Sequence, residues 1–445
     1  MLSRPLLSAL ALALCAGSVQ AANDTPNARV DQIVQQDEAQ LIEVFKALHR
    51  NPEMAFQETE TAARVASALR EQGFEVKSAI GTTGVVGILR NGPGPVLMYR
   101  ADMDALPIKE ETGLPYQSSK VTAWLNNPSQ PVMHACGHDA HTTWLLEVAK
   151  VMAQLRDQWS GTLVLVAQPA EEILEGATAM VNDGLYKFAP KPDVLIAAHV
   201  SPIFPAGSVG LREGPRLAGT DQIDVELPGI GGHGSTPHVT KDPVVMAAMA
   251  VMGYQTVVSR MVDQSKPAVL TVGAVQAGVN NNVIPDRALL KLNLRWYDQQ
   301  VRERLIAGIK SVTSGVLLMN DVPDGYVAKY TMKGYSTPVF NAKAQTERAQ
   351  AVLTAQLGAD KVLPGLPPLM GSEDFHMLAS PYPDTPTLFL EVGSGKPDVY
   401  KNLVEKQQMP SAMNHTSRFV VELPAIATGA RAVSATLLAF FADAR

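Results

Sequence analysis

Cysteine is the scarcest residue of this chain, since Cys15 and Cys136 are the only two among 445 residues. Cys15 lies in a segment that we expect to be removed, so the mature chain keeps one thiol and cannot form an internal disulfide. The fold must therefore depend on its hydrophobic cores, and roughly 150 residues per domain suggests two or three domains. A lone cysteine is by default a buried, inert thiol, but the neighbours of Cys136 argue against that default.

The chain also lacks a block of charge of one sign. Its formal net charge is -6, and the charged residues, 18% of the total, are spread along the chain. Without a basic block there is no electrostatic footprint for nucleic acid. The sequence contains neither a G-x-S-x-G nucleophile elbow nor an H-E-x-x-H zinc helix. These absences exclude two common hydrolase mechanisms.

The one apolar segment that suggests a membrane lies at the N-terminus. Arg4 gives it a positive start, residues 6–19 are apolar, and a small-x-small motif ends at Ala21. The segment is shorter than the roughly 20 residues that a spanning helix needs. We therefore predict a signal peptide over residues 1–21, export to the periplasm or the exterior, and no membrane span in the mature chain. A lipoprotein signal through Cys15 is the weaker alternative, because a leucine precedes it where a small residue is usual.

Short apolar strands alternate with helices in the first part of the mature chain. Residues 96–99 and 162–167 are expected to be buried strands, and residues 31–51 and 142–155 to be helices. This alternation is typical of an α/β domain with a mainly parallel sheet. We expect that domain to comprise residues 22–216 and 334–445.

The pattern changes near residue 217. The expected elements then follow the order β-α-β-β-α-β, with strands at 223–227, 268–275, 288–296 and 326–332 and helices at 242–260 and 299–319. This order is typical of a ferredoxin-like α+β domain. We therefore predict an inserted domain over residues 217–333.

Metal-binding residue types are concentrated in one short string. Residues 133–141 contain three histidines, one cysteine and one aspartate. Cys136 and His138 are two positions apart, and in an extended backbone such side chains share a face. A thiolate and an imidazole that converge suit a borderline-soft divalent ion. For this segment alone, a chance cluster in a loop remains the alternative.

Similar residue types follow other expected strands, at the sheet edge where open α/β sheets bind ligands. They are Asp102, Asp104, Glu171, Glu172, His199 and His415. Each is weak alone, because acids also favour a solvated helix start and a single histidine is more often structural. Together they predict a two-metal site that activates a water and polarises a carbonyl.

These motifs resemble those of the hippurate hydrolase, aminoacylase and auxin-conjugate hydrolase group of two-metal amidohydrolases and peptidases. The resemblance extends from about residue 40 to 420, in family order. The matching strings are LHRNPE at 48–53, RADMDALP at 100–107, HACGHDAH at 134–141, QPAEE at 168–172, GHGSTPH at 232–238, NVIPD at 282–286 and GSEDF at 371–375.

The resemblance implies a metal centre and a catalytic base. It implies two divalent ions per subunit, zinc, manganese, cobalt or nickel, with the ligands Cys136, His138, Glu172, His199 and His415. Glu171 would be the general base that takes a proton from the activated water and passes it to the leaving amine. Asp104 would orient a ligand from behind.

The resemblance also implies residues outside the metal centre. His233 would stabilise the oxyanion, often from a partner subunit, so we expect a homodimer formed through the inserted domain. Asn282, Arg295 and Gly371 would bind the substrate, and an arginine fork suits a free carboxylate. The chain departs from the family pattern at residues 121–130, where a loop is longer, and at 173–176, where relatives have a glycine run. Because of both departures, the substrate preference does not follow from the resemblance.

The sequence thus favours an amidohydrolase that cleaves N-acyl amino acids of the hippurate type. A metallo-dipeptidase or carboxypeptidase with the same two-metal centre is the alternative among enzymes. A metal-dependent binding protein without catalysis and a redox role for Cys136 are the alternatives outside that class.

Overall fold

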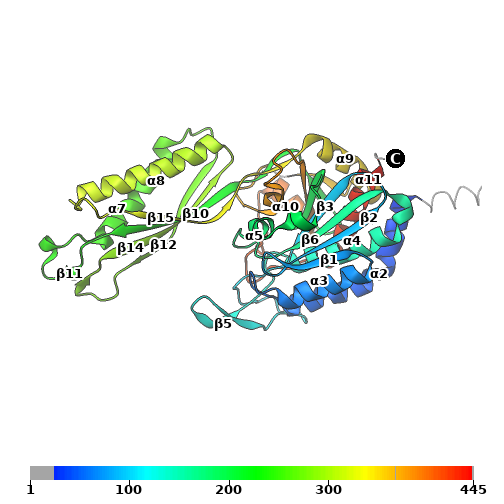
Figure 1. The fold of residues 1–445 in the computed structure, drawn as a ribbon, viewed down its shortest axis with the longest axis horizontal. Helices are drawn as coiled ribbons and strands as arrows, with labels where there is room; N and C mark the ends of the chain where they lie inside the picture. The colour runs from blue at the N-terminus through cyan, green and yellow to red at the C-terminus, as the bar shows by residue number, and fades with distance from the viewer. Residues whose placement is uncertain (1–24, 366, 443–445) are drawn as a thin grey trace, which may run out of the picture. The chain divides into compact units, whose positions relative to one another are not determined.

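The computed structural model describes residues 25–365 and 367–442, so the expected signal peptide lies outside the described residues. The chain forms two compact units (Figure 1). Unit 1 combines the segment up to Gly214 with Asn341–Leu366 and Leu378–Arg445, and unit 2 combines Pro215–Phe340 with Pro367–Met377. The expected inserted domain, 217–333, falls within unit 2.

Unit 2 also takes in the segment 367–377, which the sequence analysis assigned to the other domain. The reason is backbone hydrogen bonding far along the chain. The Ala218 N–H donates to the Gly371 carbonyl at 2.8 Å, and the Leu369 N–H donates to the Arg216 carbonyl at 2.9 Å. Such non-local pairing leaves no periodic pattern in the sequence.

Unit 1 is built on an eight-stranded sheet in the order β1-β2-β6-β3-β7-β18-β8-β17. The central strands β6, β3, β7 and β18 are parallel neighbours, which confirms the predicted α/β class with a mainly parallel sheet. The strands are β1 (Glu75–Ile80), β2 (Gly84–Asn91), β3 (Val96–Asp102), β6 (Gly161–Gln168), β7 (Val194–Pro205), β8 (Val209–Leu211), β17 (Val362–Pro364) and β18 (Thr387–Gly395).

Helices cover this sheet and bury its apolar side chains in one large core. They are α2 (Pro26–Arg50), α3 (Thr59–Glu71), α4 (His138–Gln154), α5 (Gly176–Asn182), α6 (Leu185–Phe188), α9 (Lys343–Leu357), α10 (Val399–Lys406) and α11 (Pro424–Ala442). Helix α11 contacts α2, α4 and α9. Within residues 25–365 and 367–442, two helical segments, Pro243–Met261 and Pro424–Ala442, are long and apolar enough to span a membrane by length and composition alone. The second is 83% buried, as the core helix of a globular domain is.

Unit 2 has an antiparallel sheet in the order β12-β14-β10-β15 with α7 and α8 along one face (Figure 1). Its chain order confirms the predicted ferredoxin-like fold. Alternate residues of β14 are buried, and they form a second core with the two helices. The elements are β10 (Gly219–Pro228), β11 (Gly232–His233), α7 (Pro243–Thr256), β12 (Ala268–Ala277), β13 (Val283–Ile284), β14 (Arg287–Trp296), α8 (Gln299–Met319) and β15 (Lys329–Ser336).

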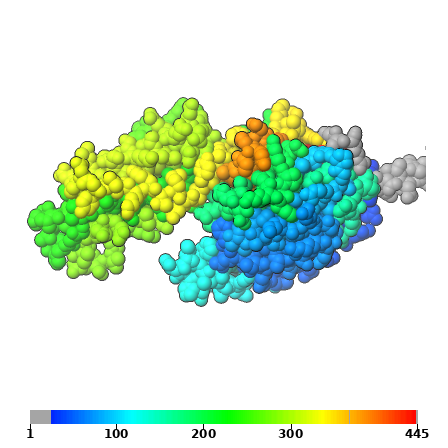
Figure 2. All heavy atoms as spheres, viewed as in Figure 1, coloured from blue at the N-terminus to red at the C-terminus, as the bar shows by residue number. Residues whose placement is uncertain are grey.

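The lengthened loop before the cysteine string is a β-hairpin. Its strands are β4 (Val121–Trp124) and β5 (Asn127–Pro131), and Figure 2 shows it projecting from the surface of unit 1. Trp124, the last residue of β4 before the turn, packs against a small cluster that includes Ala105. Leu125 at the tip is 88% exposed.

Candidate metal centre

Strand β3 ends at a buried carboxylate that the surrounding side chains keep ionised. Asp102 Oδ2 accepts a hydrogen bond from Arg100 Nη1 at 2.7 Å, and Asp102 Oδ1 is 2.5 Å from His141 Nδ1. Burial alone would raise the pKa of Asp102, but the charges of Arg100 and His138, together with the hydrogen bond from His141, outweigh it and hold the pKa well below its usual value. A fixed negative charge therefore lies beside the string that contains Cys136.

Cys136 and His138 are brought together by a turn rather than by a strand. Gly137 has a φ of 94° and is the N-cap of α4, so His138 is the first residue of that helix. A Cβ on Gly137 would lie 2.3 Å from Val200 Cγ2, so only glycine fits. The expectation that an extended backbone places the two side chains on one face is wrong, because the backbone turns at Gly137 and His138 is helical.

The five predicted metal ligands converge in unit 1. Cys136 Sγ lies 3.5 Å from His199 Nε2 and 3.3 Å from His415 Nε2. His415 Nε2 is 3.4 Å from Glu172 Oε2, and His138 Nε2 is 3.8 Å from Glu172 Oε1. The predicted base is at the same place, since Glu171 Oε2 lies 3.8 Å from His138 Nε2.

This arrangement fits divalent metal ions. Bonds of about 2.0–2.3 Å in a tetrahedral site separate the ligand atoms by roughly 3.3–3.8 Å, which is the spacing of these five side chains. Among the described residues, neither ring nitrogen of His138 nor Glu172 Oε1 has a hydrogen-bond partner, although all three atoms are buried. Such atoms each cost about 1–3 kcal/mol if left unsatisfied. A mixed thiolate, imidazole and carboxylate set is typical of zinc and related ions.

The protonation of the same groups depends on a cation. Burial, together with the charge of Glu172, raises the pKa of the Cys136 thiol well above its usual value. Burial also raises the pKa of Glu172 to about 8. Both groups would therefore hold protons at neutral pH in the absence of a cation, and a bound divalent ion would displace them.

His199 lies within β7, which continues to Pro205 instead of ending before the histidine as the sequence predicted. Its Nδ1 is 2.7 Å from the Val200 carbonyl, so Nδ1 carries the proton and donates to that oxygen. The hydrogen bond leaves Nε2 facing Cys136. A backbone carbonyl that fixes the tautomer in this way is common for metal-binding histidines.

His141 is a buried histidine of the same string whose two ring nitrogens both have hydrogen-bond partners. Its Nε2 accepts the Val200 N–H at 2.9 Å, while its Nδ1 donates to Asp102. Burial lowers the pKa of His141 to about 3, so the ring is neutral. Sequence reasoning missed this buried group of Arg100, Asp102 and His141. Only the structure shows that both ring nitrogens of His141 already form hydrogen bonds.

His415 is held in a strained backbone conformation. Its φ is 66°, which is uncommon for a residue other than glycine. The His415 N–H donates to the Ala135 carbonyl at 2.8 Å, and Asn414 Nδ2 donates to the Cys136 carbonyl at 3.2 Å. These bonds tie the late loop to the cysteine string. Strain of this kind is typical of functional sites.

The predicted orienting residue lies directly behind the glutamate pair. Asp104 Oδ1 accepts the Glu171 N–H at 3.1 Å, and Asp104 Oδ2 accepts the Glu172 N–H at 3.0 Å. Asp104 Oδ1 is also 3.3 Å from His138 Nδ1. Asp104 thus touches the backbone or side chain of three neighbours in the cluster.

His233 and Asn282 lie side by side in unit 2. Strand β11 pairs with β13, and the Gly234 N–H donates to the Asn282 carbonyl at 2.9 Å. Both side chains are exposed and line one pocket with Pro285. His233 Nδ1 is 2.6 Å from Ser235 Oγ.

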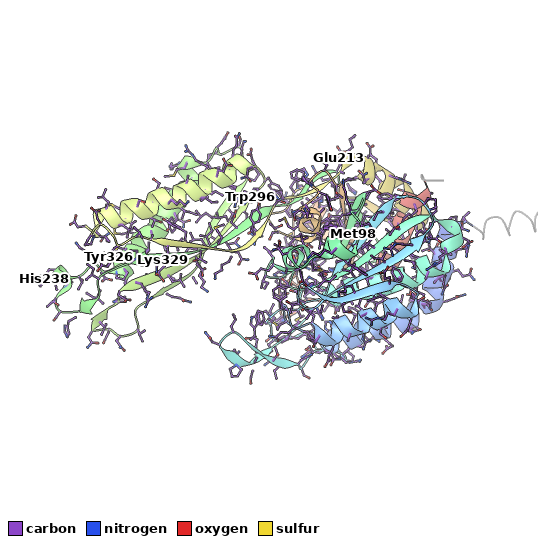
Figure 3. The ribbon with its side chains drawn as sticks, viewed as in Figure 1. Met98, Glu213, His238, Trp296, Tyr326 and Lys329 are labelled. Carbon is purple, nitrogen blue, oxygen red and sulfur yellow. The ribbon has the colours of Figure 1, made fainter. Side chains whose placement is uncertain are left out.

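Arg295 and Gly371 lie at the opposite end of unit 2. Arg295 forms hydrogen bonds with Ser372 and with Asn293, and the Gly371 carbonyl accepts the Ala218 N–H. Strand β14 begins at residue 287 and contains residue 295. At roughly 3.4 Å per residue, about 27 Å of strand separates these two positions. Figure 3 likewise shows His238, which follows β11, and Trp296 at opposite ends of unit 2. In the structure the four predicted residues therefore form two separate pairs, His233 with Asn282 and Arg295 with Gly371.

Comparison with known proteins gives consistent similarities. Residues 98–424 match peptidase family M20/M25/M40. A hippurate hydrolase from Campylobacter jejuni is 39% identical over 330 residues, which cover 74% of this chain and 82% of the relative. Thermostable carboxypeptidase 1 from Saccharolobus solfataricus is 31% identical over 413 residues, which cover 90% of this chain and 95% of the relative.

Solved structures show the same similarity. A putative aminohydrolase from methicillin-resistant Staphylococcus aureus is 28% identical, with a TM-score of 0.77 over 93% of this chain and 100% of that chain. The YXEP protein of Bacillus subtilis, described as a dinuclear metal-binding peptidase from the M20 family, is 26% identical. Its TM-score is 0.70 over 92% of this chain and 99% of that chain.

Proposed function

Because this chain belongs to peptidase family M20/M25/M40 and is a metal-dependent amidohydrolase or peptidase, we propose that it hydrolyses the amide bond of N-acyl amino acids. The resemblance read from the sequence motifs is thereby confirmed at the level of the family. The observation that carries the proposal is the convergence of Cys136, His138, Glu172, His199 and His415 around Glu171.

The five ligand residues would hold two divalent ions, zinc, manganese, cobalt or nickel, whose Lewis acidity acts on the amide carbonyl and on the attacking water. Glu171 takes a proton from that water as it adds to the carbonyl carbon. The same carboxyl then gives the proton to the amide nitrogen as the carbon–nitrogen bond breaks. Asp104 fixes the direction of the base through its hydrogen bond to the Glu171 N–H.

We assign the substrate's polar groups to residues of unit 2. Arg295 would bind the free carboxylate, because a guanidinium forms two parallel hydrogen bonds to such a group, and Gly371 lies beside it. His233 and Asn282 would stabilise the charge that develops on the carbonyl oxygen. Since these two pairs lie far apart within unit 2, the proposal includes a homodimer in which His233 and Asn282 act at the partner's centre.

The substrate class rests on the relatives. The 39% identical relative is a hippurate hydrolase, and hippurate combines an acyl group, an amide and a free carboxylate. A carboxypeptidase or dipeptidase activity is the second candidate, because a thermostable carboxypeptidase matches 90% of this chain. Turnover of hippurate-like amides compared with dipeptides, with each candidate metal added, would discriminate between the two.

The proposal places the enzyme outside the cytoplasm. Residues 1–21 carry the features of a cleaved signal peptide, namely a positive start, an apolar segment and a small-x-small motif before the cleavage point. The N-terminal sequence of the protein recovered from a cell envelope fraction would test this part, and an N-terminus at Met1 would contradict it.

The catalytic role of Glu171 is tested by substituting Glu171→Gln. This change keeps the shape of the side chain and removes the base, so we expect metal content to be retained and kcat to fall by about 10²–10⁴-fold. The matched control is Glu175→Gln, an exposed carboxyl in the same loop, which should keep wild-type kcat. Full activity in Glu171→Gln would end this mechanism.

A further inference from the structure

Glu58 is a buried carboxylate that lies at the start of α3 but does not cap that helix. It is the N-cap residue, yet its side chain makes no capping bond. Glu53 does this instead, because its carboxylate accepts the Glu60 N–H at 3.0 Å and the Thr61 N–H at 2.8 Å. The side chain of Glu58 is therefore available for contacts elsewhere.

Glu58 reaches the loop that carries the glutamate pair. Its Oε1 accepts the Ala170 N–H at 2.8 Å across 112 positions of sequence, and it also accepts the Phe56 N–H at 3.0 Å. Its Oε2 accepts the Thr83 hydroxyl at 2.5 Å. The residue has an exposed fraction of 0%, and no lysine, arginine or histidine of the described residues forms an ion pair with it. Burying an acid without an opposite charge beside it costs stability, which points to another use.

Three consecutive amides of this loop are each held by a buried carboxylate. Glu58 takes the Ala170 N–H, and Asp104 takes the Glu171 and Glu172 N–H groups at 3.1 and 3.0 Å. Ala170 has a φ of 51°, in the left-handed region that alanine rarely adopts. The free backbone would leave this conformation, so it is stabilised by the hydrogen bonds from outside the loop together with those that the Ala170 carbonyl accepts from the Glu175 and Gly176 N–H groups.

We propose that Glu58 is a positioning residue for the reaction, and that Glu58 and Asp104 together form an amide clamp on residues 170–172. By fixing the backbone at Ala170, the clamp fixes the directions in which the Glu171 and Glu172 side chains leave the loop. One carboxylate then faces the attacking water while its neighbour faces the metal centre. This inference rests on the proposed function for its catalytic consequence, but not for its effect on the metal ligand.

The clamp needs hydrogen-bond acceptors, not a charge. Glutamine at position 58 would keep one oxygen for the Ala170 and Phe56 N–H groups, and its NH₂ group would donate to the Thr83 hydroxyl. Leucine would remove both acceptors at similar volume. The pair Glu58→Gln and Glu58→Leu therefore separates loss of the hydrogen bonds from loss of the charge.

Steady-state kinetics of the metal-loaded variants test the proposal. Because a misplacement of about 1 Å at a catalytic group costs on the order of 10²-fold in rate, we expect Glu58→Leu to lower kcat by about 10–100-fold. KM should stay within about threefold, since the base does not bind the ground-state substrate. Glu58→Gln should restore most of kcat. Equal losses in the two variants, or a wild-type kcat in a folded Glu58→Leu protein, would overturn the proposal.

Glu147 provides the matched control. It is a carboxyl that is also buried, with an exposed fraction of 2%, and its pKa is raised to about 7 by burial and by Asp37. The pKa of Glu58 is likewise raised to about 7, by burial and by Asp104. Glu147 lies on α4 away from the clamp, so Glu147→Leu should keep wild-type kcat and KM. A loss of kcat in Glu147→Leu equal to that in Glu58→Leu would reduce the role of Glu58 to general packing.

Thr83→Val is the second variant if Glu58→Leu does not fold. It deletes only the hydroxyl that binds Glu58 Oε2. We expect a fall in kcat of about threefold to tenfold at unchanged KM, because one of the contacts that orient the clamp is lost. No change in kcat would contradict the proposal.

The absorption spectrum of the cobalt-loaded protein separates this proposal from the proposed function. If Glu58 positions Glu172, Glu58→Leu should alter the cobalt d–d bands or weaken cobalt binding by about tenfold or more, as is typical when groups behind a ligand are removed. Glu147→Leu should leave both unchanged. The result does not depend on turnover, so it holds even if no amide is cleaved. Identical cobalt spectra and affinities in Glu58→Leu and wild type would overturn the clamp.

Discussion

At the scale of single residues, Cys136, the one cysteine among the described residues, shows that the neighbours of a residue can override the usual role of its type. Cys136 is buried, as an inert thiol would be, but His138, His199 and His415 surround its sulfur. Its raised pKa opposes reactivity as a free thiolate. The same group becomes a good ligand once a cation favours its deprotonated form.

His49 is a second residue whose role appears only in the structure. Its Nδ1 is 2.7 Å from Asp139 Oδ2, and its Nε2 is 3.1 Å from Glu110 Oε1. Burial alone would lower the pKa of His49, but these two carboxylates outweigh it and raise the pKa to about 9. The protonated ring thus links the end of α2 to the first turn of α4, next to His138.

This linkage gives a pH dependence with a definite sign. The pKa of His49 is raised from 6.5 to about 9 on folding, so its stabilisation is complete below pH 6.5 and is lost as the pH rises through 9. The shift corresponds to about 3 kcal/mol. We expect the difference in unfolding free energy between wild type and His49→Gln to shrink by that amount between about pH 5.5 and pH 10. Denaturant titrations of the metal-free proteins measure it, and a constant difference would contradict the account.

At the scale of elements, hydrophobic periodicity predicted the strands that build the site, and their bounds differ mostly by a few residues. The expected strands 96–99 and 162–167 correspond to β3 and β6, and the expected helix 299–319 coincides with α8. These segments are long or fully buried, so their local pattern of apolar residues is enough to predict their secondary structure. The hairpin β4–β5 was not predicted, because its residues are mixed in polarity and mostly exposed. The strand β8 was not predicted, because it has only three residues and pairs with the distant strands β17 and β18.

The site was predictable in its residue types but not in its contacts. The motifs indicated five candidate metal ligands, and the structure brings all five together. Sequence spacing could not show that α4 begins at His138 through a left-handed Gly137, nor that Val200 and Asp102 occupy His141. Glu58 was missed for the same reason, since its partner Ala170 lies on another element. Hydrogen bonds between distant segments have no local signature.

The loop after β6 contains Gly176, which packs closely against the backbone of Pro169. A Cβ on Gly176 would lie 1.6 Å from the Pro169 carbonyl oxygen, so Gly176→Ala must displace the loop that carries Glu171 and Glu172. We expect a loss of about 2–3 kcal/mol in stability and a fall in kcat/KM, measured by thermal unfolding and kinetics.

Gly315→Ala is the control for this substitution. Gly315 lies in α8, and nothing lies within 4 Å of an added Cβ, so alanine should stabilise that helix by roughly 0.5–1 kcal/mol. The interpretation of Gly176 would be wrong if both variants had the stability and activity of wild type.

At the scale of the whole molecule, the two pairs of unit 2 residues lead to a test for the proposed dimer. About 27 Å of β14 separates residue 287, which follows the β11–β13 pair, from Arg295. The account therefore assigns His233 and Asn282 to a different site from Arg295 and Gly371. Mixing Glu171→Gln with His233→Ala chains should then create one complete site in each mixed dimer. With random pairing, we expect about a quarter of wild-type activity from two inactive proteins.

Subunit mixing followed by an amide hydrolysis assay measures this recovery. The control is a mixture of Glu171→Gln with itself, which should stay inactive. If the mixed sample shows no more activity than its components, His233 acts within its own chain and the two-chain site is wrong.

The central claim is that side chains from β7, the turn before α4, the loop after β6 and the late loop at His415 together bind two divalent ions. Elemental analysis of the purified protein, stripped with chelator and reloaded with zinc, manganese, cobalt or nickel, tests it most directly. The account predicts two ions per chain in wild type and fewer in His138→Ala. A protein that binds none of these metals under any loading condition would contradict it.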